Sequence, residues 1–302
     1  MNLLGKRYFF FALSLLIIVP GLLILAFSGM PLSLDFTGGS LLEVKFDSGA
    51  PQPAELITMY ADLGIKDTQV TTTDSGSMII KSAFLDDKAR SAITSQMEAS
   101  FGAVTVLRFD SVGPAIGAQV TSRAALAVIV AALVVVAYIT WTFRGIVHSF
   151  RYGVCAITAM VHDVAIVFAV AGIGSLVAGW EIDALFLTAL LTVIGFSVQD
   201  KIVVFDRIRE NANVLRKLDF EKLVNHSIVQ TLQRSINTQL MTVEFMLLAL
   251  ALFGGITLRE FAVILLVGLF SGTYSSIFIA APILVVWETQ EWKTWFKKQE
   301  AI

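Results

Sequence analysis

Cysteine and histidine are scarce in this chain. Its 302 residues include one cysteine, Cys155, and three histidines, His148, His162 and His226. A single cysteine excludes an intramolecular disulfide, and the scattered histidines exclude the usual Cys/His spacing of a zinc site. The sequence also lacks a phosphate-binding loop and a nucleophile with a positioned base. We therefore expect no cofactor, no metal and no enzymatic activity.

Charged residues are scarce as well. They make up 15% of the chain, whereas hydrophobic residues make up 56% and the mean hydropathy is +0.77. An ordinary soluble domain is about 25% charged, so this composition indicates an integral membrane protein. The formal net charge of −2 identifies no partner, because the distribution of charge along a membrane protein matters more than its sum.

Six apolar runs approach or reach the length of about 20 residues that an α-helix needs to cross a bilayer, so we predict six transmembrane helices. They are Tyr8–Phe27, Ala124–Phe143, Tyr152–Gly172, Ala184–Phe205, Ile236–Phe253 and Phe261–Val286. For the first run a cleaved signal peptide is the alternative, because Ala26 and Ser28 offer small residues near its end. A signal peptide would have an apolar core of about 7–15 residues, so the greater length favours an uncleaved anchor.

Residues 30–123 are polar enough to form a separate domain between the first two runs. Alternating and helix-spaced apolar positions follow one another in the order β-α-β-β-α-β. The strands are expected within 34–46 and at 69–73, 78–83 and 103–109, and the helices at 53–63 and 86–101. This order predicts an α+β ferredoxin-like domain without chemistry of its own. Eleven acidic and seven basic residues between Asp35 and Arg123, a net charge of −4, give no indication of nucleic-acid binding.

Basic residues fix the expected orientation. The connections after the second, fourth and sixth runs are rich in Lys and Arg and lie on the same side as Lys6 and Arg7, whereas the opposite connections are poor in both. By the positive-inside rule, both termini are cytoplasmic and the polar domain is external. We expect residues 1–29 to hold the first helix, 30–123 the external domain and 124–302 five helices. Within the last part, residues 206–233 form a cytoplasmic segment with a partly amphipathic helix.

Three ionisable groups lie inside or at the edge of the apolar runs: Asp163, Asp200 and Arg234. An ionisable group at membrane depth costs several kcal/mol unless it meets water or a partner, so it indicates function by default. A carboxylate that alternately meets and loses an arginine would bind and release a proton as the helices move. A static ion pair that only fixes helix packing explains the same residues. Spacing does not decide between the two.

Glu244 is a further acidic residue in the fifth run, where neighbouring Asn, Gln and Thr residues form a polar face. It lies ten residues after Arg234, which at about 100° per residue separates the two by roughly 80° around a helix. Glu244 is therefore either an additional protonatable group or a side chain that hydrogen-bonds across helices.

Five sequence motifs carry a family resemblance. They are Asp35-Phe36-Thr37-Gly38-Gly39, Val112-Gly113-Pro114, Ile116-Gly117, His162-Asp163 and Val203-Val204-Phe205-Asp206-Arg207-Ile208-Arg209-Glu210-Asn211. With these motifs the chain resembles, over essentially its whole length, the SecF family of the bacterial SecDF protein-export complex. That family is related to the resistance-nodulation-division transporters.

The resemblance implies an accessory of the Sec machinery in the cytoplasmic membrane that is driven by the proton motive force. Asp200 and Arg234 match the family's proton-path residues. Asp163 and Glu244 are further candidates from their place in the apolar runs alone, and Glu244, like Gln239, departs from a family pattern that more often has Thr and Ser there. The implied partners are SecD, the SecYEG translocon with its associated membrane factors, the translocating preprotein and the lipid bilayer. The Phe36–Gly39 turn is expected to be structural, because glycine tolerates backbone angles that other residues avoid.

The sequence departs from the family pattern beside Asp200, where Gln199 and Lys201 replace an Asn and a small polar residue. Lys201 either reaches back to Asp200 and lowers its proton affinity or snorkels to the cytoplasmic membrane surface. We expect the second, because adjacent helical residues point about 100° apart. Two other functions stay open: a proton-coupled exporter of small solutes or lipids, which would need about twice as many helices, and a structural subunit without coupling. Sodium could also replace the proton, because carboxylates at membrane depth serve either ion.

Overall fold

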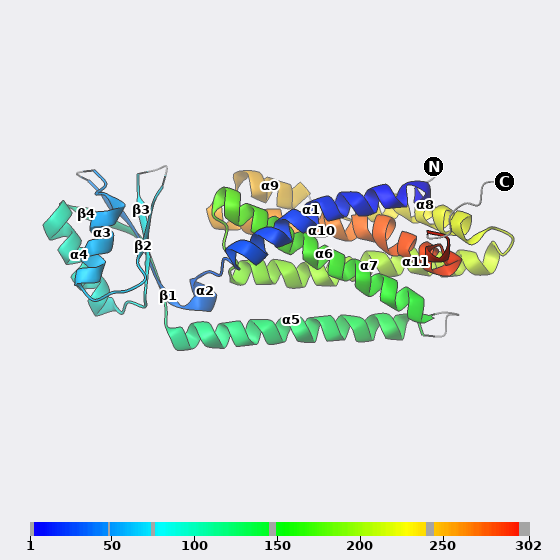
Figure 1. The fold of residues 1–302 in the computed structure, drawn as a ribbon, viewed down its shortest axis with the longest axis horizontal. Helices are drawn as coiled ribbons and strands as arrows, with labels where there is room; N and C mark the ends of the chain where they lie inside the picture. Colours follow the sequence, from blue (N-terminus) through cyan, green and yellow to red (C-terminus); the bar gives the residue numbers. More distant parts are fainter. Residues whose placement is uncertain (1–2, 48, 74–75, 145–148, 240–244, 296–302) are drawn as a thin grey trace. The chain divides into compact units, whose positions relative to one another are not determined.

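The computed structural model describes residues 3–47, 49–73, 76–144, 149–239 and 245–295. The chain divides into two compact units, and Figure 1 labels the elements of both. The smaller unit is Leu32–Leu126, here called the outer unit; the larger, called the helical unit, combines Met1–Pro31 with Ala127–Ile302.

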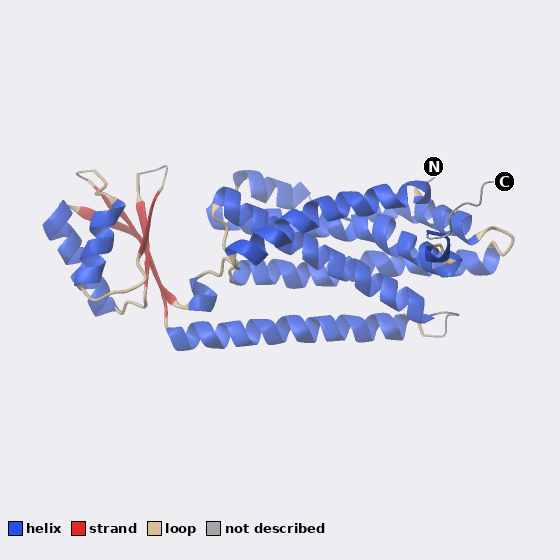
Figure 2. Ribbon diagram, viewed as in Figure 1, coloured by secondary structure: helices blue, strands red, loops and turns tan. Residues whose placement is uncertain are grey.

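The outer unit is one antiparallel sheet with two helices on one of its faces, as Figure 2 shows. Its elements are β1 (Gly39–Phe46), α3 (Pro53–Asp62), β2 (Gln69–Thr72), β3 (Met78–Ser82), α4 (Asp87–Phe101) and β4 (Val104–Val112). The strand order across the sheet is β2-β3-β1-β4. The element order β-α-β-β-α-β that the sequence predicts is present, with bounds shifted by a few residues.

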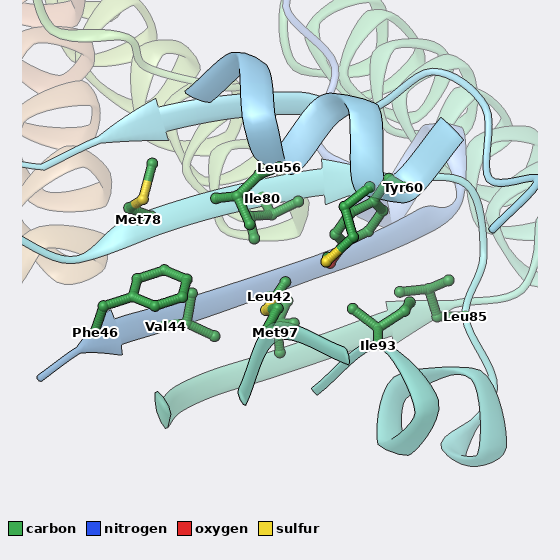
Figure 3. Packing of buried hydrophobic residues seen from close by; sticks show 11 residues of the cluster. Leu42, Val44, Phe46, Leu56, Tyr60, Met78, Ile80, Leu85, Ile93 and Met97 are labelled. Atoms are coloured by element: carbon green, nitrogen blue, oxygen red, sulfur yellow. The ribbon is translucent and has the colours of Figure 1, made fainter. Parts of the chain in front are cut away.

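The core of the outer unit follows from the alternation in β1. Leu42, Val44 and Phe46 all point to the face that the helices cover. Leu56 and Tyr60 of α3 pack in the same hydrophobic cluster as these strand residues, and so do Ile93 and Met97 of the adjacent helix α4 (Figure 3). Asp86 caps α4 by accepting a hydrogen bond of 2.7 Å from the Ala89 amide, which satisfies one of the free donors at a helix start.

The helical unit contains the long apolar helices. These are α1 (Arg7–Ser28, preceded by the short turn η1, Leu4–Lys6), α5 (Pro114–Thr142, which begins in the outer unit), α6 (Ser149–Ala178), α7 (Ala184–Val214) and α10 (Ile256–Ser275), which continues through η3 (Ser276–Ala280) into α11 (Ala281–Thr289). Shorter helices are α8 (Phe220–Gln239), α9 (Phe245–Phe253) and α12 (Trp292–Trp295).

Five helices among the described residues are long and apolar enough to cross a membrane: Leu4–Ser28, Pro114–Thr142, Ser149–Ala178, Ala184–Val214 and Leu258–Thr289. They coincide with five of the six predicted runs. The fifth run falls on the polar end of α8, on residues 240–244, which are outside the described part, and on α9. The count of six therefore stays a prediction. The fourth helix extends beyond the predicted end at Phe205, because α7 continues to Val214.

Small residues allow the central helices to approach closely. A Cβ on Gly272 of α10 would lie 3.3 Å from the Ser197 Cα of α7, and a Cβ on Gly21 of α1 would collide with Ala169 of α6. The π-helical turn η3 lies directly before Pro282, whose ring cannot follow a regular α-helical turn. Close packing of α6, α7 and α10 brings the polar side chains of these helices together.

Candidate functional site

Asp163 lies at the centre of a group of polar side chains in the helical unit. Its side chain is fully buried on α6. It accepts hydrogen bonds from Ser197 (2.6 Å), Lys201 (2.8 Å), Ser271 (2.7 Å) and Ser275 (2.7 Å), and His162 Nδ1 lies 3.1 Å from it. The donors come from α6, α7 and α10. A buried carboxylate is tolerated when such donors replace its water shell.

Lys201 is the cation of this group. It is 0% exposed, and its Nζ lies 2.8 Å from Asp163 Oδ2, 2.9 Å from the Ser197 carbonyl oxygen and 2.6 Å from Ser197 Oγ. These three acceptors use all three donors of an ammonium group. The expectation that Lys201 snorkels to the membrane surface is wrong, because a carboxylate on the facing helix pairs with it inside the bundle.

Asp200 has a different environment, although it is the neighbour of Lys201 in the chain. The side chains point about 100° apart on α7, so Lys201 faces α6 while Asp200 faces α8. Asp200 is 6% exposed and accepts one hydrogen bond, at 3.3 Å, from Ser235. Its Oδ2 atom is buried and forms no hydrogen bond within the described part of the chain. This carboxyl is therefore poorly compensated.

Arg234 precedes Ser235 on α8 and is exposed. It lies close enough to act electrostatically on Asp200, but among the described residues no ion pair joins the two. Thr273 of α10 also lies beside Asp200, but its buried Oγ1 atom has no hydrogen-bond partner of acceptable geometry in the described part of the chain. Arg234 is therefore next to Ser235, the donor to Asp200, without an ion pair to the carboxyl among the described residues. Glu244, the remaining candidate, lies outside the described residues.

A groove of about 390 Å³ opens beside Arg234, between α7 and α8. Its lining is Ile202, Val203, Asp206, Arg207, Glu210, Gln230, Thr231 and Arg234. Asp206 and Arg207 of the predicted motif are held by local ion pairs, Asp206 with Arg209 at 2.5 Å and Arg207 with Glu210 at 2.5 Å. Arg207 also donates to Gln230 of α8 at 2.7 Å. This motif therefore joins α7 to α8.

Two other predicted motifs meet in the outer unit. The short helix α2 (Leu34–Thr37) ends at Gly38 and Gly39, whose φ angles are 72° and 124°. A Cβ on Gly38 would lie 3.1 Å from the Pro114 Cα at the start of α5, and Thr121 Oγ1 donates to the Phe36 carbonyl at 2.9 Å. The Phe36–Gly39 turn and the Gly113-Pro114 segment therefore pack together, and glycine is required at the contact.

Sequence reasoning missed the pairing of Asp163 with Lys201 and the three serines around it. A signal was available, because Ser197 and Lys201 are four residues apart and so are Ser271 and Ser275. Residues four apart share one face of a helix. A polar face on each of two apolar helices indicates that both faces meet a common partner. No group of three or more His, Cys, Asp or Glu side chains that could hold a metal ion occurs among the described residues.

Comparison with known proteins gives consistent matches. The family model of "Protein export membrane protein SecD/SecF, C-terminal" matches residues 92–290, and that of the "SecD/SecF GG Motif" matches residues 23–50. The chain is similar to the protein translocase subunit SecF of Anaerolinea thermophila, with 66% identity over 300 residues, 99% of this chain and 97% of that protein. The corresponding subunit of Thermobaculum terrenum is 43% identical over 306 residues, 97% of this chain and 96% of that protein.

A solved structure matches as well. The crystal structure of SecDF, a translocon-associated membrane protein from Thermus thermophilus, has a TM-score of 0.79 and 34% sequence identity. The match covers 96% of this chain and 39% of that chain. This chain therefore spans about two fifths of the length of the SecDF protein.

Proposed function

The chain belongs to the SecD/SecF family of protein export membrane proteins, and from that premise we propose that it uses the proton motive force, together with SecD, to promote preprotein translocation. As a SecF-type protein it is a subunit of the Sec protein-export machinery. The observation that carries the proton-coupling part is the state of Asp200. Among the described residues this buried carboxyl has one long hydrogen bond and no ion pair, although Arg234 directly precedes its hydrogen-bond donor.

Proton exchange at Asp200 requires a path for water and a group that moves. The groove between α7 and α8 brings solvent to Arg234, which precedes the buried donor Ser235 in the chain; the remaining distance to Asp200 must open when the helices move. When Arg234 approaches, its positive charge favours the ionised carboxylate; when it withdraws, the buried carboxyl favours a proton. A movement of α8 relative to α7 would therefore couple proton transfer to the shape of the bundle.

The membrane arrangement is the second part of the proposal. A cluster of basic residues follows α7, and Arg7 opens α1, so we place these ends and both termini in the cytoplasm. We assign residues 30–123 to the external face as a ferredoxin-like domain, because a four-stranded sheet of order β2-β3-β1-β4 with two helices supports that fold. The sixth crossing would be formed by the end of α8 together with α9, in the cytoplasmic membrane of a bacterium.

Exposed apolar surface supports the proposed partners. The most apolar 18-residue stretch is 50% buried in α6, 50% buried in α7 and 61% buried in the helix from Leu258 to Thr289. In α1 the share is 11% and in α5 it is 6%. Surface of this kind requires lipid or another protein around it. We propose that the bilayer and SecD cover it, and that SecYEG and the preprotein engage the assembled complex.

The test is preprotein export into membrane vesicles, with and without an imposed proton gradient, at matched amounts of each variant. Asp200→Asn and Arg234→Met should abolish the gradient-dependent part of export and leave the ATP-driven part intact. The matched controls are Asp219→Asn and Lys217→Met, which remove the same charges from exposed positions between α7 and α8. If both test variants assemble and keep full gradient-dependent export, the coupling proposal fails, and the chain is then a structural subunit without coupling.

A further inference from the structure

The ammonium of Lys201 occupies a cage that is built from oxygen atoms. Its three contacts, Asp163 Oδ2, Ser197 Oγ and the Ser197 carbonyl, lie between 2.6 and 2.9 Å from Nζ. The hydroxyl of Ser275 lies against the same carboxylate oxygen at 2.7 Å. A carboxylate, hydroxyls and a backbone carbonyl at such spacing are the ligands that hard cations take in proteins.

Lys201 differs from a free ion in one respect, because its charge is tied to α7. A free cation can leave Asp163 during a transport cycle, whereas the ammonium can leave only if α7 moves away from α6. Ser197 reinforces the position, since its hydroxyl both donates to Asp163 and accepts from Nζ. Removing one member of a buried pair leaves an uncompensated charge in a medium that solvates it poorly.

We infer that Lys201 is the ion-specificity residue of this protein: its ammonium fills a monovalent-cation site at Asp163 and thereby confines ion exchange to the carboxyl of Asp200. This inference rests on the proposed coupling function and deepens it. Without the lysine side chain, Asp163 Oδ2 and the hydroxyl and carbonyl oxygens of Ser197 would border a space of ammonium size that carries one negative charge. Sodium is a hard monovalent cation that such a space would hold.

The probe is sodium itself, applied to the full-length chain in detergent micelles. Thermal unfolding is followed at constant ionic strength while sodium chloride replaces choline chloride. The variants are Lys201→Ala, which opens the space, and Lys201→Gln, which keeps most of the side-chain volume but not the charge. The work is done at about pH 8, where protons compete least for the carboxylate. Besides Lys201, the titratable group in contact with Asp163 among the described residues is His162, whose ring stacks on Tyr274, and both are unchanged in every variant.

The expected result is a sodium-dependent rise in the unfolding midpoint of Lys201→Ala, on the order of 3 °C or more at saturating sodium. Lys201→Gln should show a smaller rise, because its side chain fills part of the space. Wild type should show no such rise, because the ammonium occupies the site. The double variant Asp163→Asn/Lys201→Ala should fold and also be insensitive, because it lacks the charge that attracts sodium.

Two outcomes would overturn the inference. One is an equal sodium response, or none, in wild type and in the lysine variants that fold. The other is that both lysine variants aggregate in sodium chloride and in choline chloride while the double variant folds. Sodium would then fail to replace the missing ammonium, so the site at Asp163 would accept no free cation. Unfolding in micelles involves neither a gradient nor export. Full gradient-dependent export by Asp200→Asn and Arg234→Met in the vesicle assay would therefore refute the proposed function without altering this result.

Discussion

Asp163 and Asp200 are both buried carboxyls in the helical unit, yet the two are compensated very differently. Asp163 accepts hydrogen bonds of 2.6–2.8 Å from three serines and a lysine, whereas Asp200 accepts one of 3.3 Å from Ser235. A fully compensated carboxylate has nothing to gain from a proton, while a poorly compensated one does. Depth within an apolar run therefore does not identify the exchanging group; the side chains on the facing helices do.

The largest expected effect comes from breaking the compensated pair. Asp163→Asn leaves the Lys201 ammonium buried without its partner, so we expect a loss of about 3–5 kcal/mol in the free energy of unfolding. Lys201→Met should cost a similar amount. The double variant should be far more stable than the sum of the two losses predicts, which denaturant unfolding in micelles would measure. Additive losses would mean that the two side chains do not act as a pair.

A matched pair of serine variants compares the two carboxyls directly. Ser271 donates to Asp163 at 2.7 Å and Ser235 donates to Asp200 at 3.3 Å, and both serines are buried. Ser271→Ala removes a short bond to a charged group and should cost about 1.5–3 kcal/mol, whereas Ser235→Ala should cost less than about 1 kcal/mol. Unfolding of both variants under the same conditions gives the comparison. Equal losses would contradict the difference in compensation.

The geometry of the cage depends on the approach of α10 to α7. Gly272→Ala places a Cβ 3.3 Å from the Ser197 Cα, so the helices must separate slightly and we expect a loss of about 1–2 kcal/mol. Gly195→Ala on α7 is the control, because its Cβ would meet no atom within 4 Å. It should be neutral or slightly stabilising, since alanine favours a helix more than glycine does. If Gly195→Ala lowers the free energy of unfolding and Gly272→Ala does not, the close contact of Gly272 with Ser197 is not critical for stability.

The smallest effect is expected in the outer unit, where a buried polar atom is also left without a partner. Within the described residues the Tyr60 hydroxyl forms no hydrogen bond, and burial raises the pKa of its phenol above the ordinary value of 10.0. Below about pH 10 both folded and unfolded states keep the proton; above it only the unfolded state loses it, so stability falls.

Tyr60→Phe should therefore change neutral-pH stability by less than about 1 kcal/mol and remove the alkaline loss. Hydrogen exchange of the β1 and β3 amides at two pH values would measure both effects. If Tyr60→Phe loses as much stability at alkaline pH as the wild type does, the loss does not come from ionisation of Tyr60.

The sequence predicted much of the fold because the signals were local. Alternation in Leu42, Val44 and Phe46 identifies β1, and the length of the apolar runs identifies five of the helices. The resemblance to the SecF family is confirmed by the family matches. The end of α7 was misplaced because its last residues are polar, and a helix that continues into water has no apolar signal.

The site was predicted only in part. Asp163, Asp200 and Arg234 stand out in sequence because they interrupt apolar runs. Their pairing depends on which helix faces which, and it joins residues that are 38 positions apart for Asp163 and Lys201 and 112 apart for Asp163 and Ser275. Lys201 is an example: it follows Asp200 in the sequence, but in the folded chain it forms an ion pair with Asp163. Such a contact follows from packing rather than from any local pattern.

The most direct test of the account is infrared difference spectroscopy of the chain in lipid bilayers during a pH change, read at the stretching band of a protonated carboxyl. The account predicts a titrating band that disappears in Asp200→Asn and persists in the charge-neutral double variant Asp163→Asn/Lys201→Met. A band that persists in Asp200→Asn and disappears in the double variant would contradict it, because Asp163 would then be the group that exchanges the proton.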